Sequence, residues 1–116
     1  MKELVVERDV YTQATPAWLT IKVTASEKEI FKYYDGVFPI IKAGNKLYKG
    51  TDKEVYRRIM KIAEEIADIA CEHGLTINKW NDNIHGSQKW LVKNPQAIKQ
   101  IMQLISKAEE ILASVA

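Results

Sequence analysis

The sequence predicts an α+β fold, in which a small antiparallel sheet of about four strands packs against two long C-terminal helices. Alternating apolar and polar residues, typical of half-buried strands, concentrate before residue 50. Apolar residues spaced three and four apart, typical of amphipathic helices, dominate the rest of the chain. Glycine and proline are sparse, and no repeat or linker interrupts the sequence. We therefore expect a single α+β domain over residues 1–116.

The N-terminal half is expected to supply the strands. Residues 17–25 alternate between apolar and polar side chains and predict the clearest strand. Residues 4–6 predict a weaker strand at an edge of the sheet. Residues 37–41 are apolar on both faces and contain a proline, which suits an edge strand or a bulge. Gly44 and Asn45 predict a two-residue hairpin turn after it.

Residues 26–36 fit two structures. As a strand, they would alternate their aromatic side chains and turn back at Asp35 and Gly36. As a helix, they would begin with a capping box from Ser26 to Glu29 and end at the glycine. The acidic first turn favours the helix slightly.

The C-terminal half predicts two helices. The first begins at a capping box formed by Thr51 and Glu54 and ends at Gly74. The second begins at Asn94, a favourable N-cap residue, followed by Pro95 in the first helical position. Each helix carries a broad apolar stripe for packing against the sheet or the other helix.

Composition excludes several classes of protein. The net charge is only +2, and no apolar run is long enough to span a membrane. The first residues lack the apolar core of a secretion signal, so we expect a cytoplasmic protein. No phosphate-binding loop or dinucleotide-binding motif is present, so no cofactor is expected.

A metal site is also not expected. Cys71, His73, Asp82 and His85 are the residues that could be drawn together as ligands. However, the first two are two positions apart on a predicted helix and point in different directions. Cys71 is instead expected to be a small buried residue, and it has no cysteine partner for a disulfide.

Charge is unevenly distributed along the chain. Residues 22–61 hold ten basic and five acidic residues, whereas residues 62–82 hold one basic and five acidic residues. The first long helix is therefore basic in its N-terminal half, where the helix dipole favours acidic residues. It is acidic in its C-terminal half, where the dipole favours basic residues. Basic residues interleaved with tyrosines suit phosphates and bases. The residues expected to bind nucleic acid or another partner are Lys42, Lys46, Tyr48, Lys49, Lys53, Arg57, Arg58 and Lys61.

Residues 75–93 are the least regular segment and predict a long functional loop. Asp82, His85 and Ser87 in this loop are residue types used in proton transfer and nucleophilic catalysis. They are weak catalytic candidates, because the same residue types are the commonest turn formers.

A small non-catalytic binding or regulatory protein is therefore the favoured function. We expect it to act on a protein partner, with Trp18 and Trp80 at the interface. The first alternative is a nucleic-acid-binding protein that uses the basic hairpin and helix. The second is a hydrolase-like enzyme centred on the polar loop. The apolar seam of the C-terminal helix, over residues 98–115, would also suit a homodimer.

Overall fold

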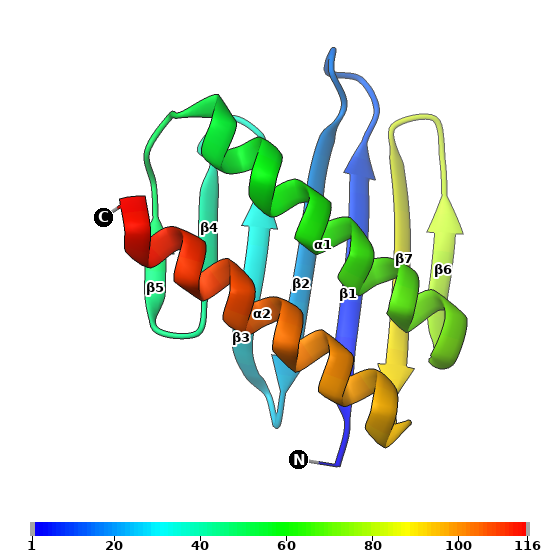
Figure 1. Ribbon diagram of the computed structural model, residues 1–116. Coiled ribbons are helices and arrows are strands. Elements are labelled where there is room, and N and C mark those ends of the chain that lie inside the picture. The colour runs from blue at the N-terminus through cyan, green and yellow to red at the C-terminus, as the bar shows by residue number, and fades with distance from the viewer. Residues whose placement is uncertain (1, 116) are drawn as a thin grey trace.

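The computed structural model describes residues 2–115, which form a seven-stranded antiparallel sheet with two helices across one face (Figure 1). The strand order is β5-β4-β3-β2-β1-β7-β6. The expected α+β class is confirmed. In chain order the elements are β1 (Leu4–Tyr11), β2 (Trp18–Ala25), β3 (Lys28–Tyr34), β4 (Ile40–Ala43), β5 (Lys46–Tyr48), α1 (Lys53–His73), β6 (Leu75–Asn81), β7 (His85–Val92) and α2 (Pro95–Val115).

The sheet is larger than the predicted four strands, and the helices are not both C-terminal. The segment 75–93, expected to be a loop, forms the hairpin β6–β7 between α1 and α2. This hairpin joins the sheet through β7, which pairs with β1 along its whole length. Consequently β1 lies in the interior of the sheet, whereas residues 4–6 were predicted to form an edge strand.

The segment 26–36 contains a strand, so the favoured helix is wrong and the alternative is right. Ser26 and Glu27 adopt φ values of 50° and 64° and form the two-residue turn between β2 and β3. Positive φ at both central residues is typical of hairpin turns that match the twist of a sheet. Phe31 and Tyr33 are buried and pair with Val23 and Ile21 of β2. Pairing with β2 and β4 therefore outweighs the local capping signal.

Local signals at the other turns and caps were more reliable. Gly44, with φ of 58°, and Asn45 form the predicted turn between β4 and β5. The helix α1 starts one residue later than expected, because its N-cap is Asp52, whose carboxylate accepts a 3.0 Å hydrogen bond from the Glu54 N–H. Thr51 does not take that role.

The core lies between the sheet and the two helices. Alternate residues of β1 to β4 and β7 face the helices and are buried, including Trp90 at 2% exposed. The apolar seam of α2 is buried within the chain against the sheet and α1. Within residues 2–115, neither α1 nor α2 offers the continuous apolar stretch that a membrane-spanning helix needs.

The N-cap of α2 provides a first test of the fold. The Asn94 side-chain oxygen accepts hydrogen bonds from the N–H groups of Gln96 and Ala97, at 2.9 and 3.1 Å. Asn94→Ala removes both acceptors and is expected to lower the free energy of unfolding by about 1 kcal/mol. Asn94→Asp keeps a side-chain acceptor and should retain most of this stability. Urea unfolding of the three proteins measures the difference, and equal stability of the alanine variant would contradict the assignment.

Candidate functional site

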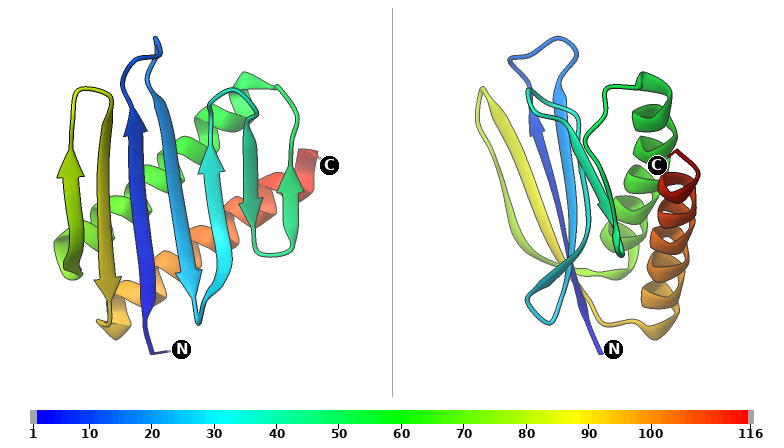
Figure 2. Two further views of the ribbon diagram at one scale, coloured as in Figure 1. Left: turned by 180° about the vertical axis from the view of Figure 1, so that it is seen from behind. Right: turned by 90° about the vertical axis from the view of Figure 1, so that its left-hand side faces the viewer.

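The face of the sheet that points away from the helices is not covered by any element within residues 2–115 (Figure 2). Strand alternation and pairing register determine which side chains lie on it. We term it the open face. Its residues include Val5, Glu7, Asp9, Tyr11, Trp18, Thr20, Lys22, Thr24, Lys32, Tyr34, Ile40, Lys42, Leu47, Leu75, Asn78, Trp80, His85, Ser87, Lys89 and Leu91.

Four lysines form a row across the open face, which we term the lysine row. Lys22 pairs directly with Lys32, which pairs directly with Lys42, so three ammonium groups lie on neighbouring strands. On the other side of Lys22, Glu7 separates it from Lys89. One Glu7 oxygen lies 3.9 Å from Lys22 Nζ and 3.7 Å from Lys89 Nζ. Because like charges directly opposite one another destabilise a sheet, the three adjacent lysines are an unfavourable arrangement for folding alone.

Four aromatic rings gather nearer the β1–β2 and β6–β7 turns and form the aromatic cluster. Tyr11 stacks on Trp18 with ring centroids 5.0 Å apart and an interplanar angle of 28°. His85 lies 5.2 Å from Tyr11 and 6.3 Å from Trp80, centroid to centroid. Trp80 is 48% exposed, and His85 is exposed as well. The cluster thus offers accessible ring surface from β1, β2, β6 and β7.

A shorter polar row lies between the lysine row and part of the aromatic cluster. The pairing register places four residues side by side on β3, β2, β1 and β7, namely Tyr34, Thr20, Asp9 and Ser87. On β6, the residue next to Ser87 is Trp80. Successive rows are about 7 Å apart, because they are separated by two residues along each strand. A single extended ligand can therefore contact both the lysines and the rings. Asp9 is the one acid of this polar row.

The structure separates Lys42 from the other members of the basic patch expected from the sequence. Lys42 alternates with the buried residues of β4 and lies on the open face, whereas Lys46 and Tyr48 lie on the helix side of the same hairpin. The remaining members, Lys49, Lys53, Arg57, Arg58 and Lys61, belong to the β5–α1 connection or to α1. The Tyr48 ring packs against Tyr56, with centroids 5.8 Å apart.

The unusual charge pattern of α1 has partners elsewhere in the fold. In its acidic half, Glu64 accepts a 2.9 Å hydrogen bond from Arg8 Nε of β1. In its basic half, Arg57 Nε donates to Glu54 at 2.9 Å. This hydrogen bond holds the pKa of the Glu54 carboxyl below its usual value. Two of the charges on α1 that oppose the helix dipole are thus explained by ion pairs.

Of the weak catalytic candidates, Asp82 lies in the β6–β7 turn, whereas His85 and Ser87 belong to β7. The Asp82 carboxylate accepts 2.7 Å hydrogen bonds from the N–H groups of Ile84 and His85. Within residues 2–115, no hydrogen bond joins the side chains of Asp82, His85 and Ser87. The ring of His85 instead contacts aromatic neighbours, and Ser87 belongs to the polar row.

Acid titration tests the turn. The backbone N–H groups of His85 and Ile84 hold the pKa of Asp82 below its ordinary value. A lowered carboxyl pKa stabilises the fold above the unfolded-state pKa, and this contribution is lost as the pH falls through the folded-state pKa. Asp82→Ala should therefore reduce stability most near pH 7, and the difference from the native protein should shrink in strong acid. Urea unfolding at several pH values measures it, and a pH-independent difference would contradict the prediction.

The residues considered as metal ligands do not come together. No group of three or more histidine, cysteine or acidic side chains within residues 2–115 is placed to hold a metal ion. Cys71 is exposed on α1, so its predicted burial is wrong. The free thiol lies on the outer surface of the helix, not in the core.

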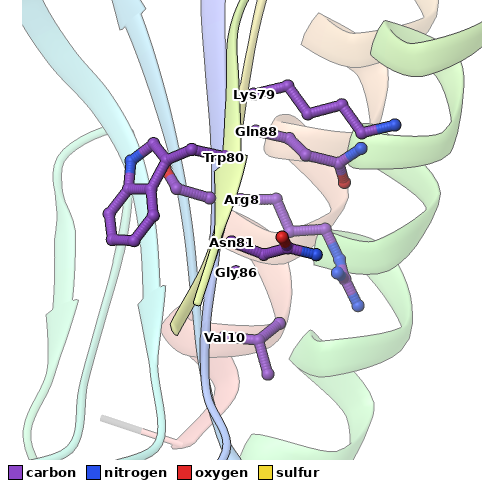
Figure 3. Close-up of a pocket in the computed structure, with 8 residues that line it drawn as sticks. Arg8, Val10, Lys79, Trp80, Asn81, Gly86 and Gln88 are labelled. Atoms are coloured by element: carbon purple, nitrogen blue, oxygen red, sulfur yellow. The ribbon is translucent and has the colours of Figure 1, made fainter. Parts of the chain in front are cut away.

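A pocket on the helix side of β1, β6 and β7 shows how the sheet separates two sets of side chains (Figure 3). Its volume is about 430 Å³. Arg8, Lys79, Asn81 and Gln88 point toward the helices, whereas Trp80 points to the opposite side. Arg8 donates to Glu64 from two of its nitrogens. The Trp80 ring is therefore presented on the open face.

Trp18 and Trp80 were expected at an interface, and both lie in the aromatic cluster. The sequence reasoning missed Lys22, Lys32 and Lys89, which complete the lysine row with Lys42. Their polar positions in alternating strands were visible in the sequence. Their alignment was not, because it depends on the strand order and register.

Known proteins give no further guide. Comparison with protein-family models, curated proteins and solved structures finds no significant match to this chain.

Proposed function

We propose that the protein binds single-stranded nucleic acid on the open face of its sheet. The observation that carries this proposal is the lysine row beside the exposed aromatic cluster. Lysines neutralise backbone phosphates, and aromatic side chains stack on unpaired bases. The arrangement explains why three lysines are kept directly opposite one another at a cost to folding.

A single strand suits the surface better than a duplex does. The major groove of DNA admits a helix or a two-stranded ribbon, whereas the open face belongs to a sheet of seven strands. Stacking also requires bases whose faces are free, and these occur in single strands, loops and ends. Trp80, with 48% of its surface exposed, is accessible for such a contact.

A protein partner remains the other candidate, because Trp18 and Trp80 are the kind of residue that anchors protein interfaces. The lysine row argues against it. Lysine is depleted in the centre of protein–protein interfaces, and here lysines cross the middle of the face. The open face carries four lysines and two acids, Glu7 and Asp9. This excess of positive charge complements a polyanion better than it complements an apolar partner surface.

Fluorescence anisotropy with labelled 12-nucleotide probes tests the proposal. Single-stranded RNA, single-stranded DNA and a duplex of the same sequence are titrated with protein near 50 mM salt. We expect both single strands to bind at least about tenfold tighter than the duplex. No binding of any single strand at this salt concentration would overturn the proposal, and an acidic protein partner would then become the leading candidate.

A further inference from the structure

A pocket of about 530 Å³ lies beyond the end of the aromatic cluster, where β2 begins and β3 ends. Its other wall is the first half of α1. Trp18 belongs both to this pocket and to the open face, so the two sites adjoin at that residue. The residues that matter here are Trp18, Tyr33, Asp35, Tyr56, Arg57 and Met60.

The walls of the pocket are mainly apolar. Tyr33 and Tyr56 meet edge to face, with centroids 6.1 Å apart and an interplanar angle of 62°. Both hydroxyls are engaged within the protein, because Tyr56 donates to the Gly50 carbonyl at 3.0 Å and Tyr33 donates to Asp35 Oδ2 at 2.9 Å. Tyr33 and Tyr56 are only 1% and 8% exposed, so they close the inner side of the pocket. Its accessible apolar surface comes mainly from Trp18, Pro39 and Met60.

Asp35 supplies the polar end of the pocket. Its Oδ1 accepts a 2.8 Å hydrogen bond from the Leu19 N–H, and its Oδ2 accepts from Tyr33. Burial and the neighbouring carboxylate raise the pKa of Tyr33 above its usual range, so the phenol stays a donor. A carboxylate has about four acceptor positions, so each oxygen keeps one for a ligand. Two adjacent N–H donors on the ligand would satisfy both.

Two cationic side chains stand at the same pocket. Lys53 is exposed and makes no ion pair within residues 2–115, and Arg57 is paired with Glu54. They provide positive charge for an anionic group of a bound ligand. The pocket thus combines apolar walls, a carboxylate acceptor and nearby cations. Its volume lies within the range of small-molecule sites.

We propose that this pocket binds a guanine nucleotide, with the guanine N1–H and amino group donating to Asp35 and the phosphate beside Lys53 and Arg57. Guanine presents two neighbouring donors on its pairing edge, whereas adenine and uracil do not. The nucleotide is either free or the end of a strand that lies on the open face. The second source rests on the function proposed above, and the first does not.

Mononucleotide binding tests the pocket without the open face. Isothermal titration with GMP, IMP, AMP and UMP is expected to show GMP at least about tenfold tighter than the other three, since IMP lacks the amino group and loses one hydrogen bond to the carboxylate. Asp35→Asn replaces one acceptor by a donor, and its amide oxygen can still accept from the Leu19 N–H. This variant should bind GMP at least about tenfold more weakly than the native protein does. Circular dichroism checks that it folds.

A second variant keeps the test decisive if Asp35→Asn does not fold. Met60→Trp fills part of the pocket and leaves the Asp35 carboxylate unchanged, so it should weaken GMP binding at least about tenfold. Lys107→Glu, at an exposed residue of α2 outside both the pocket and the open face, should leave GMP affinity unchanged. Equal affinity for the four nucleotides, no binding of GMP at millimolar concentration, or full GMP affinity in Met60→Trp would each overturn the proposal.

Short strands separate the two sources of the nucleotide. Eight-nucleotide probes with guanine at one end, at the other end or absent are compared by anisotropy. Tighter binding of one guanine-ended probe, lost in Asp35→Asn, assigns the pocket to the end of a strand. GMP binding without any strand binding assigns it to a free nucleotide and refutes the proposed function. Strand binding without GMP preference supports the proposed function and refutes the pocket.

Discussion

Lys32→Glu is expected to weaken single-strand binding by about 10- to 100-fold at 50 mM salt while making the protein more stable. The substitution places a carboxylate between Lys22 and Lys42, directly opposite both. Two like-charge contacts become two opposite-charge contacts, each contributing roughly 0.2–1 kcal/mol. Binding falls because one phosphate contact is lost and a negative charge is added. The two effects therefore have opposite signs, which a general loss of folding cannot produce.

Lys61→Glu is the matched control for this prediction. It makes the same change of charge at an exposed residue of α1, outside the open face. We expect it to change strand affinity no more than about twofold. Anisotropy and urea unfolding of both variants provide the measurement. An equal loss of affinity in the two variants, or a loss of stability in Lys32→Glu, would contradict the role given to the lysine row.

Trp90→Ala and Trp80→Ala are expected to separate folding from binding. Trp90 is 2% exposed on the helix side of β7, and its truncation should cost about 3–5 kcal/mol of unfolding free energy. That is a large part of the 5–15 kcal/mol typical of a whole protein. Trp80 points to the open face, and its truncation should change stability by less than about 1 kcal/mol. The loss of one stacked base should instead weaken strand binding by about 1–3 kcal/mol.

Denaturant unfolding and anisotropy on the same two variants check this pair. The assignment of the two tryptophans to opposite sides of the sheet predicts that each assay responds to one variant. If Trp80→Ala bound single strands as tightly as the native protein, the aromatic cluster would have no part in binding. If Trp90→Ala were as stable as the native protein, the described core would be wrong.

Elements with local signals were predicted well from the sequence. The N-cap of α2 at Asn94, the turn at Gly44 and Asn45, and the long amphipathic α1 depend on neighbouring residues or on a regular period. Segment 26–36 shows the limit of such signals. Its capping box is real as a pattern, yet pairing with two strands makes it part of the sheet.

The interior position of β1 and the hairpin β6–β7 could not be predicted, because both depend on contacts between distant segments. The same reason explains the candidate site. Trp18 and Trp80 are far apart in sequence, and Tyr11 and His85 join them only once β1 lies between β2 and β7. The lysine row likewise needs the register of several strand pairs. The residue types could be read from the sequence, but their assembly on one face could not.

The salt dependence of single-strand affinity tests the central claim most directly. Affinity for a 12-nucleotide single strand is measured between 50 and 300 mM salt for the native protein and for Lys32→Ala. Each phosphate of a single strand that the protein neutralises contributes about −0.7 to the slope of log K against log salt. If each of the four lysines neutralises one phosphate, the expected slope is about −2 to −3. Lys32→Ala should make this slope less negative by about 0.7. A slope near zero, or an identical slope in the two proteins, would show that the lysine row does not contact phosphates.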